Sequence, residues 1–182
     1  MKGDMGENGR LERLAAFAKR NWIAIRSCLF FIALLALWLT WYPHIVDSQV
    51  LDGLLKFTAQ LTGSVLGILG THVDVSGTAV SSADFSMRIG HECTAIVPMV
   101  ILLCAVLAYP SRIKQKLVCL AIGLPILFLL NILRTVTLYY IGAQLPDFFD
   151  IAHFVVWQSV MILAVVTLWF LWVMRVVNVR SA

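Results

Sequence analysis

The sequence contains little charge for its length. Only 13% of its 182 residues are Asp, Glu, Lys or Arg, whereas soluble globular domains carry about 25%. Hydrophobic residues make up 60% of the chain, and the mean hydropathy is +0.89. This composition excludes an ordinary water-soluble domain and indicates an integral membrane protein. The length suits one membrane domain over residues 1–182 and leaves little room for a second.

The sequence also lacks the patterns that mark disulfide frameworks and metal sites. Its four cysteines, at positions 28, 93, 104 and 119, form no CxxC pair, and all but Cys93 fall inside apolar runs, where a thiol is an ordinary packing group. No HExxH motif occurs, and His91, Glu92 and Cys93 cannot all point at one ion from a regular helix or strand. We therefore expect no disulfide, no metal and no cofactor.

Long apolar runs predict about four transmembrane helices. Residues 22–42, 117–141 and 151–174 are each long enough to cross the roughly 30 Å hydrocarbon core of a bilayer. Residues 93–109 form a slightly shorter run that carries no charge. The first run follows basic residues, as in a signal sequence, but it ends in LTWYP without a small-residue cleavage site. We expect it to remain as an uncleaved anchor.

The region between the first two spans contains a fifth apolar stretch and two short alternating runs. Within residues 46–70, Gln49, Asp52, Lys56 and Gln60 recur at helical spacing, which predicts an amphipathic helix at the outer interface or leaning on the bundle. A fifth span is the alternative. The alternating runs, separated by Gly and Ser, predict a small β-hairpin that packs on the helices or the bilayer. The predicted fold class is an all-α membrane protein with an interfacial amphipathic helix and a small extracytoplasmic β-hairpin.

The distribution of basic residues predicts the topology. With four spans and a cytoplasmic N-terminus, 11 of the 14 basic residues but only 3 of the 10 acidic ones lie inside, as the positive-inside rule requires. A span at residues 46–70 would instead place the basic loop outside, so four spans are favoured. Because the net charge of +4 is spread in this way, we expect no nucleic-acid partner. The predicted order is a cytoplasmic segment (1–20), span 1 (22–42), an extracytoplasmic region (43–92), span 2 (93–109), a cytoplasmic loop (110–116), span 3 (117–141), an extracytoplasmic loop (142–150), span 4 (151–174) and a cytoplasmic tail (175–182).

Three chemically versatile residues are predicted to lie at one depth near the outer face. Cys93 opens the second span, and His153 lies at the outer start of the fourth. Arg134 lies seventeen residues after Leu117, which is roughly 26 Å of helix rise. Ionisable groups at such depth are costly and usually face one another or a water-filled cavity. The alternatives are a packing thiol, an interfacial histidine, and an arginine that reaches the head groups or pairs with an acidic residue of the 142–150 loop.

The helix-end positions predict a reactive thiol at Cys93. A helix N-terminus and a nearby Arg or His lower the pKa of a thiol. His153 at a helix start favours the neutral imidazole, which is the form that acts as a base. Asp150 either orients this imidazole or caps the helix, and Glu92 either caps a helix or lies near the thiol, where it would raise the thiol pKa. A Cys–His pair with a cationic oxyanion stabiliser suits acyl transfer, which makes Cys93, Arg134 and His153 the candidate catalytic residues.

The segments around these residues resemble the signature regions of the exosortase/archaeosortase superfamily. They are FSMRIGHECTAIVP (85–98), NILRTVTLY (131–139) and IAHFVVW (151–157). In that family a Cys opens one membrane helix, an Arg follows in an N-x-x-R stretch, and a His begins the next helix. The chain resembles the compact members that lack extra N-terminal helices, close to the exosortase H group.

The resemblance implies a cysteine protease-transpeptidase of the inner (plasma) membrane, active on its periplasmic side. Its partners would be secreted proteins with a C-terminal motif, a transmembrane span and a basic tail, and a membrane lipid or glycan acceptor. A thioacyl-enzyme intermediate at Cys93 would carry the product to that acceptor. The alternatives are a non-enzymatic membrane assembly or transport subunit and, third, a metal-dependent intramembrane protease.

Overall fold

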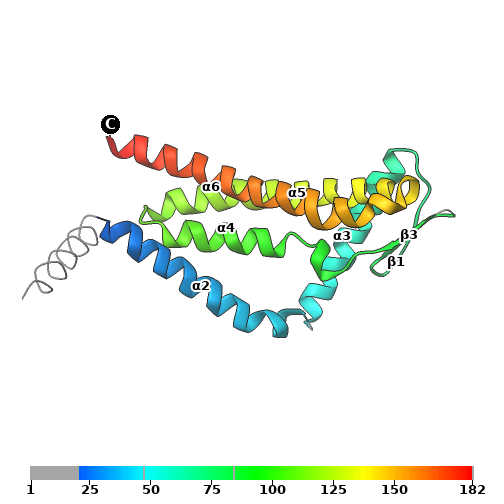
Figure 1. Cartoon of the computed structure of the whole chain (residues 1–182), viewed down its shortest axis with the longest axis horizontal. Coiled ribbons are helices and arrows are strands. Elements are labelled where there is room, and N and C mark those ends of the chain that lie inside the picture. The colour runs from blue at the N-terminus through cyan, green and yellow to red at the C-terminus, as the bar shows by residue number, and fades with distance from the viewer. Residues whose placement is uncertain (1–20, 47, 84, 182) are drawn as a thin grey trace, which may run out of the picture.

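The computed structural model of the chain describes residues 21–46, 48–83 and 85–181. The predicted cytoplasmic segment 1–20 and the last residue of the predicted tail lie outside the described residues. Four helices run along the long axis of the molecule (Figure 1): α2 (Trp22–Val46), α4 (Ile96–Ala108), α5 (Ile113–Gln144) and α6 (Trp157–Ser181). α4 packs against each of the other three.

Three segments of this bundle are long and apolar enough to cross a membrane, as the hydropathy predicts. They are Trp22–Val46, Ile113–Gln144 and Pro146–Val176. Their large apolar side chains are mostly exposed, which is stable in lipid and costly in water. α4 is a shorter apolar helix of 13 residues, or about 20 Å. The expected fold class, an all-α membrane protein, is confirmed.

Two of the differences between the observed and the predicted helix boundaries have a local cause in the structure. α4 begins at Ile96, not at Cys93, because Thr94 has an extended backbone that separates a short 3-10 turn, η1 (His91–Cys93), from the helix. α5 begins at Ile113, inside the predicted 110–116 loop, because the backbone N–H of Arg112 donates to the side chain of Gln115 and starts the helix early. A hydrophobicity profile contains no information on such local backbone conformations and hydrogen bonds.

The amphipathic stretch forms α3 (Gln49–Ile68), which packs against the bundle. The side chain of Ser48 accepts a hydrogen bond from the third residue of the helix and caps its start. On the buried face, the hydroxyls of Thr62 and Thr135 lie 2.8 Å apart and join α3 to α5. On the exposed face, Lys56 pairs with Asp52. The predicted contact of this helix with the bundle is thus present.

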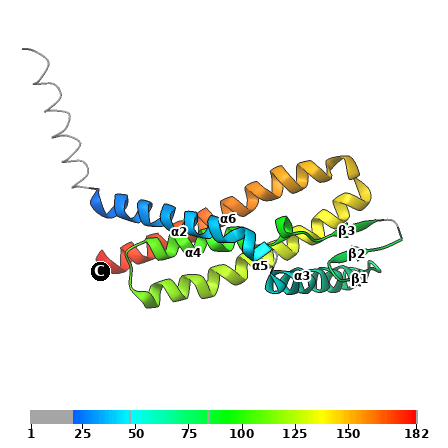
Figure 2. The same ribbon diagram turned by 90° about the horizontal axis from the view of Figure 1, so that it is seen from below.

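The predicted hairpin is instead a three-stranded antiparallel sheet. β1 (Asp74–Ser76) pairs with β2 (Ala79–Ser81), which pairs with β3 (Ser86–Arg88). Figure 2 shows this sheet beside α3 at one end of the molecule. The ring of Phe85 occupies the position that a side chain at Gly142 would take, so the sheet abuts α5 closely. Each strand has only three residues, which is too short for alternation in the sequence to set the number of strands.

The chain turns between α5 and α6 through two short helical segments. The first is a 3-10 turn, η2 (Pro146–Phe148), and the second is a π-helical stretch, η3 (Ile151–Val156), that continues into α6. π-helical turns are rare and concentrate at functional sites. His153 is the third residue of this stretch, which begins at the residue where the fourth span was predicted to start.

Candidate active site

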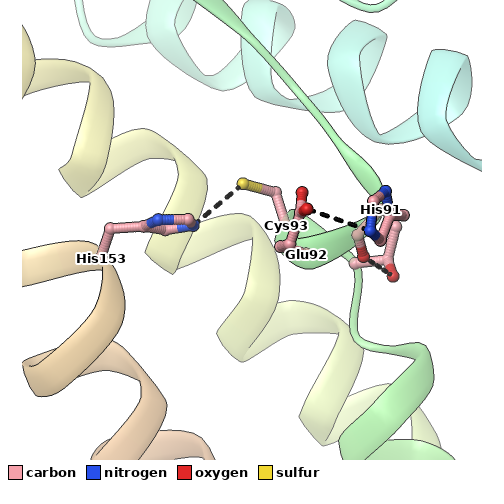
Figure 3. Close-up of polar contacts among 5 residues, drawn as sticks. His91, Glu92, Cys93 and His153 are labelled. Atoms are coloured by element: carbon pink, nitrogen blue, oxygen red, sulfur yellow. Dashed lines mark hydrogen bonds and ion pairs between the residues drawn. The ribbon is translucent and has the colours of Figure 1, made fainter. Parts of the chain in front are cut away.

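The structure places the side chains of Cys93 and His153 in direct contact. Cys93 Sγ lies 3.3 Å from His153 Nε2, although the two residues are 60 positions apart in sequence. Figure 3 shows the sulfur pointing toward the imidazole, while His91 lies on the other side of the turn. Both Cys93 and His153 are 8% exposed. The predicted convergence of a thiol and an imidazole is therefore a feature of the folded chain.

A buried amide holds the backbone that carries the thiol. Cys93 closes the 3-10 turn, and its backbone N–H donates to the carbonyl of Gly90. Its own carbonyl accepts a hydrogen bond of 2.8 Å from Asn131 Nδ2, on α5. Asn131 has no exposed surface, so water does not compete for this bond. The amide thereby fixes the turn to the long helix beside it.

Two aromatic rings flank the imidazole of His153. The ring of Phe149 stacks with it at a centroid distance of 5.9 Å, and the ring of Phe154 meets it edge-on at 4.4 Å. Asp150 is exposed and makes no side-chain capping hydrogen bond. The predicted capping role of Asp150 is thus not observed, and the imidazole is oriented by packing.

Arg134 lies buried next to this pair. It is 4% exposed, so it does not extend to head groups, and among the described residues no ion pair joins it to Asp147 or Asp150. Within the same described part of the chain, its Nε has no hydrogen-bond partner. A buried guanidinium with an unpaired N–H group is costly.

A cavity of about 350 Å³ adjoins the site. Arg134 and His153 both line it, together with Glu92, Thr94 and apolar residues of α4 and α6. The Cys93 thiol is not part of the wall, because it is turned toward the imidazole. A ligand in this cavity would therefore meet the imidazole and the guanidinium directly and would approach the thiol past His153.

The pKa of Cys93 departs from the expected direction. Burial raises the pKa of this thiol above its ordinary value of 9.0, and the charge of Glu92 raises it further, while the charge of Arg134 and the Gly90 backbone lower it. The net shift is upward. The expectation of a lowered pKa was wrong because Cys93 precedes α4 by three residues and loses hydration in the turn. The expected upward effect of Glu92 is confirmed.

These opposing charges predict opposite effects of two substitutions on thiol ionisation. Glu92→Gln removes a charge that raises the Cys93 pKa, so alkylation of Cys93 by iodoacetamide should reach its half-maximal rate at a lower pH. Arg134→Gln removes a charge that lowers the pKa, so the half-maximal rate should move to a higher pH. The measurement is the alkylation rate as a function of pH in a background with Cys28→Ala, because Cys28 is the exposed thiol among the described cysteines. Shifts in the same direction for both variants would contradict this electrostatic description.

Some of the supporting residues were not identified from sequence. Nothing in the sequence singled out Phe149 and Phe154, because aromatic residues near a span end are common. For Asn131 the sequence contained a partial indication. It lies one turn before Arg134 in the N-x-x-R stretch, and both side chains were expected to face a common interior. Both are in fact buried.

A family model described as transmembrane exosortase matches residues 14–173. Comparisons with curated proteins and with solved structures gave no match. The matched region contains α2 to η3 and most of α6, and with them Cys93, Arg134 and His153. The chain belongs to the transmembrane exosortase family.

Proposed function

We propose that the chain is a membrane-embedded cysteine protease-transpeptidase that cleaves the C-terminal sorting signal of secreted proteins. Membership in the exosortase family makes it a membrane sorting enzyme for secreted proteins in general. The observation that carries the cysteine mechanism is the 3.3 Å contact between Cys93 Sγ and His153 Nε2. A nucleophile within hydrogen-bond reach of a base is the arrangement that covalent acyl transfer requires.

The first half-reaction breaks the peptide bond. Cys93 Sγ attacks the carbonyl carbon while His153 Nε2 takes the thiol proton, which gives a tetrahedral intermediate with a negative oxygen. Arg134, whose side chain lines the cavity beside the pair, donates to this oxygen. The C–N bond then breaks, His153 passes its proton to the leaving amine, and a thioester remains on Cys93.

The raised pKa of Cys93 sets the order of proton transfer. Burial raises the pKa of the Cys93 thiol above its ordinary value, which favours the protonated form. The proton therefore moves to His153 during the attack, as in general-base catalysis, and not beforehand in a resting ion pair. The hydrogen bond from Asn131 to the Cys93 carbonyl supports this step by holding the sulfur against the base.

The second half-reaction regenerates the thiol. An acceptor amine, hydroxyl or water loses a proton to His153 and attacks the thioester carbonyl, and the departing sulfur recovers the proton. The acceptor in this proposal is a membrane lipid or glycan. The substrate carries a recognition motif, a transmembrane span and a basic tail. The distribution of basic residues supports an active site on the periplasmic side of the inner membrane.

Trapping of the thioester tests this proposal. The membrane-embedded protein is co-expressed with a secreted protein of the same cell that ends in an apolar span and a basic tail. A covalent adduct of the two should appear on denaturing gels, disappear on treatment with hydroxylamine, and be absent for Cys93→Ala. Processing of the secreted protein without an adduct at Cys93, or no processing at all, would favour a non-enzymatic membrane subunit.

A further inference from the structure

The cavity beside His153 adjoins a second, larger one. The second cavity has a volume of about 650 Å³ and lies along the N-terminal half of α2. Ile101 on α4 and both Val165 and Val166 on α6 line the two cavities together. We call these two adjoining cavities together the α4 groove: its floor is α4, and α2 and α6 form walls on either side. Figure 1 shows α4 running between these two helices.

The sequence of the bundle explains why the α4 groove is open. Part of its floor consists of Ala105 and Ala108, and small residues leave room for a neighbouring helix to approach closely. α2 contributes no buried residue although it packs against α4. Side chains of α2 such as Phe31 line the cavity without being buried in it. The groove is lined mainly by apolar residues and lies within the membrane-spanning part of the bundle.

The length of the α4 groove distinguishes between its two plausible occupants. On α2 the lining covers Asn21 to Phe31 and, separately, Tyr42, so its first stretch spans roughly 15 Å of helix rise. On η3 and α6 it runs without a long gap from His153 to Trp169, roughly 24 Å. This second length approaches the roughly 30 Å hydrocarbon core that a transmembrane helix crosses, whereas the acyl chain of a lipid covers only about half of that core.

We infer that the α4 groove is the docking site for the transmembrane helix of the substrate, an inference that rests on the proposed function. A helix in this groove would have one end beside Arg134 and His153 and the other beside Trp169. The peptide segment that leaves the helix at the first end then lies next to the catalytic pair. Gln158 lines this same part of the groove, and its amide supplies a hydrogen-bond partner to unwound backbone, which is costly in lipid when left unpaired.

Two tryptophan substitutions on α6 test this inference. Val166 lines both cavities and is 54% exposed, while Leu163 on the same helix is 66% exposed and outside the groove. Both positions accept a large side chain without disturbing the core. Val166→Trp should lower processing of the co-expressed secreted protein by about tenfold or more, because it overfills the groove, and Leu163→Trp should leave it unchanged. Both variants should keep the wild-type rate of Cys93 alkylation.

A cross-linking experiment identifies the occupant. A photoreactive benzophenone side chain at position 166 of the Cys93→Ala protein should cross-link to the co-expressed secreted protein, and one at position 163 should not. Cross-links to lipid alone at position 166, or normal processing by Val166→Trp, would overturn the docking site while leaving the cysteine mechanism intact. If Cys93→Ala processes the secreted protein normally, the proposed function itself is wrong.

Discussion

Replacement of Cys93 by serine is expected to reduce processing of the sorting signal by at least about 10³-fold. A serine hydroxyl has nearly the same size, but it is a much weaker nucleophile than a thiol in a site that evolved for sulfur. Loss of the nucleophile typically removes almost all of the covalent catalysis of such a site. Processing is measured in cells as the ratio of full-length to shortened secreted protein.

The other cysteines provide the control for this substitution. Cys104 is buried in α4 and Cys119 in α5, and neither lines the α4 groove or the cavity beside His153. Cys104→Ala and Cys119→Ala should process the secreted protein at the wild-type rate. Normal processing by Cys93→Ser, with the protein present in the membrane at the wild-type level, would rule out the thiol mechanism.

Replacement of His153 by glutamine is expected to lower processing by about 10²–10⁴-fold, the usual contribution of a general base. Glutamine fills much of the same volume and can donate or accept a hydrogen bond, but it does not take a proton. The Cys93 thiol should remain present and reactive toward iodoacetamide at high pH, because deprotonation by hydroxide needs no base in the protein. The experiment therefore compares processing and alkylation in the same preparation.

A second histidine separates this effect from a general loss of stability. His72 is exposed and lies before β1, so His72→Gln should retain full processing. If His153→Gln loses processing and alkylation together and melts at a lower temperature, the imidazole contributes to the stability of the fold and not to the reaction. If it loses processing alone, the imidazole is a participant in the reaction.

Much of the bundle could be predicted because hydrophobicity alone decides which segments enter lipid. The runs at 22–42, 117–141 and 151–174 lie within α2, α5 and the segment Pro146–Val176. The number of strands in the sheet could not be predicted, and neither could the 3-10 turn that separates Cys93 from the start of α4. They depend on hydrogen bonds between a few residues, which leave no periodic pattern in a sequence.

The meeting of Cys93 and His153 was predictable from depth, since polar groups at one level of a membrane tend to face one another. The upward shift of the Cys93 pKa was not, because it depends on how much water the folded turn excludes. The α4 groove could not be predicted from the sequence either. It arises from the relative placement of three helices, each of which looks like an ordinary apolar span.

The hydrogen bond from Asn131 to the carbonyl of Cys93 has a consequence for how such chains diverge. The residue that carries the sulfur is anchored to α5 by a bond that does not involve the strands that precede it. The exposed positions of the sheet, such as Ser86 and Arg88, can therefore change into a new recognition surface, while the buried Val80 and Met87 stay packed in the same core as Cys93. Natural selection is thereby free to change what the enzyme recognises without rebuilding the chemistry that follows recognition.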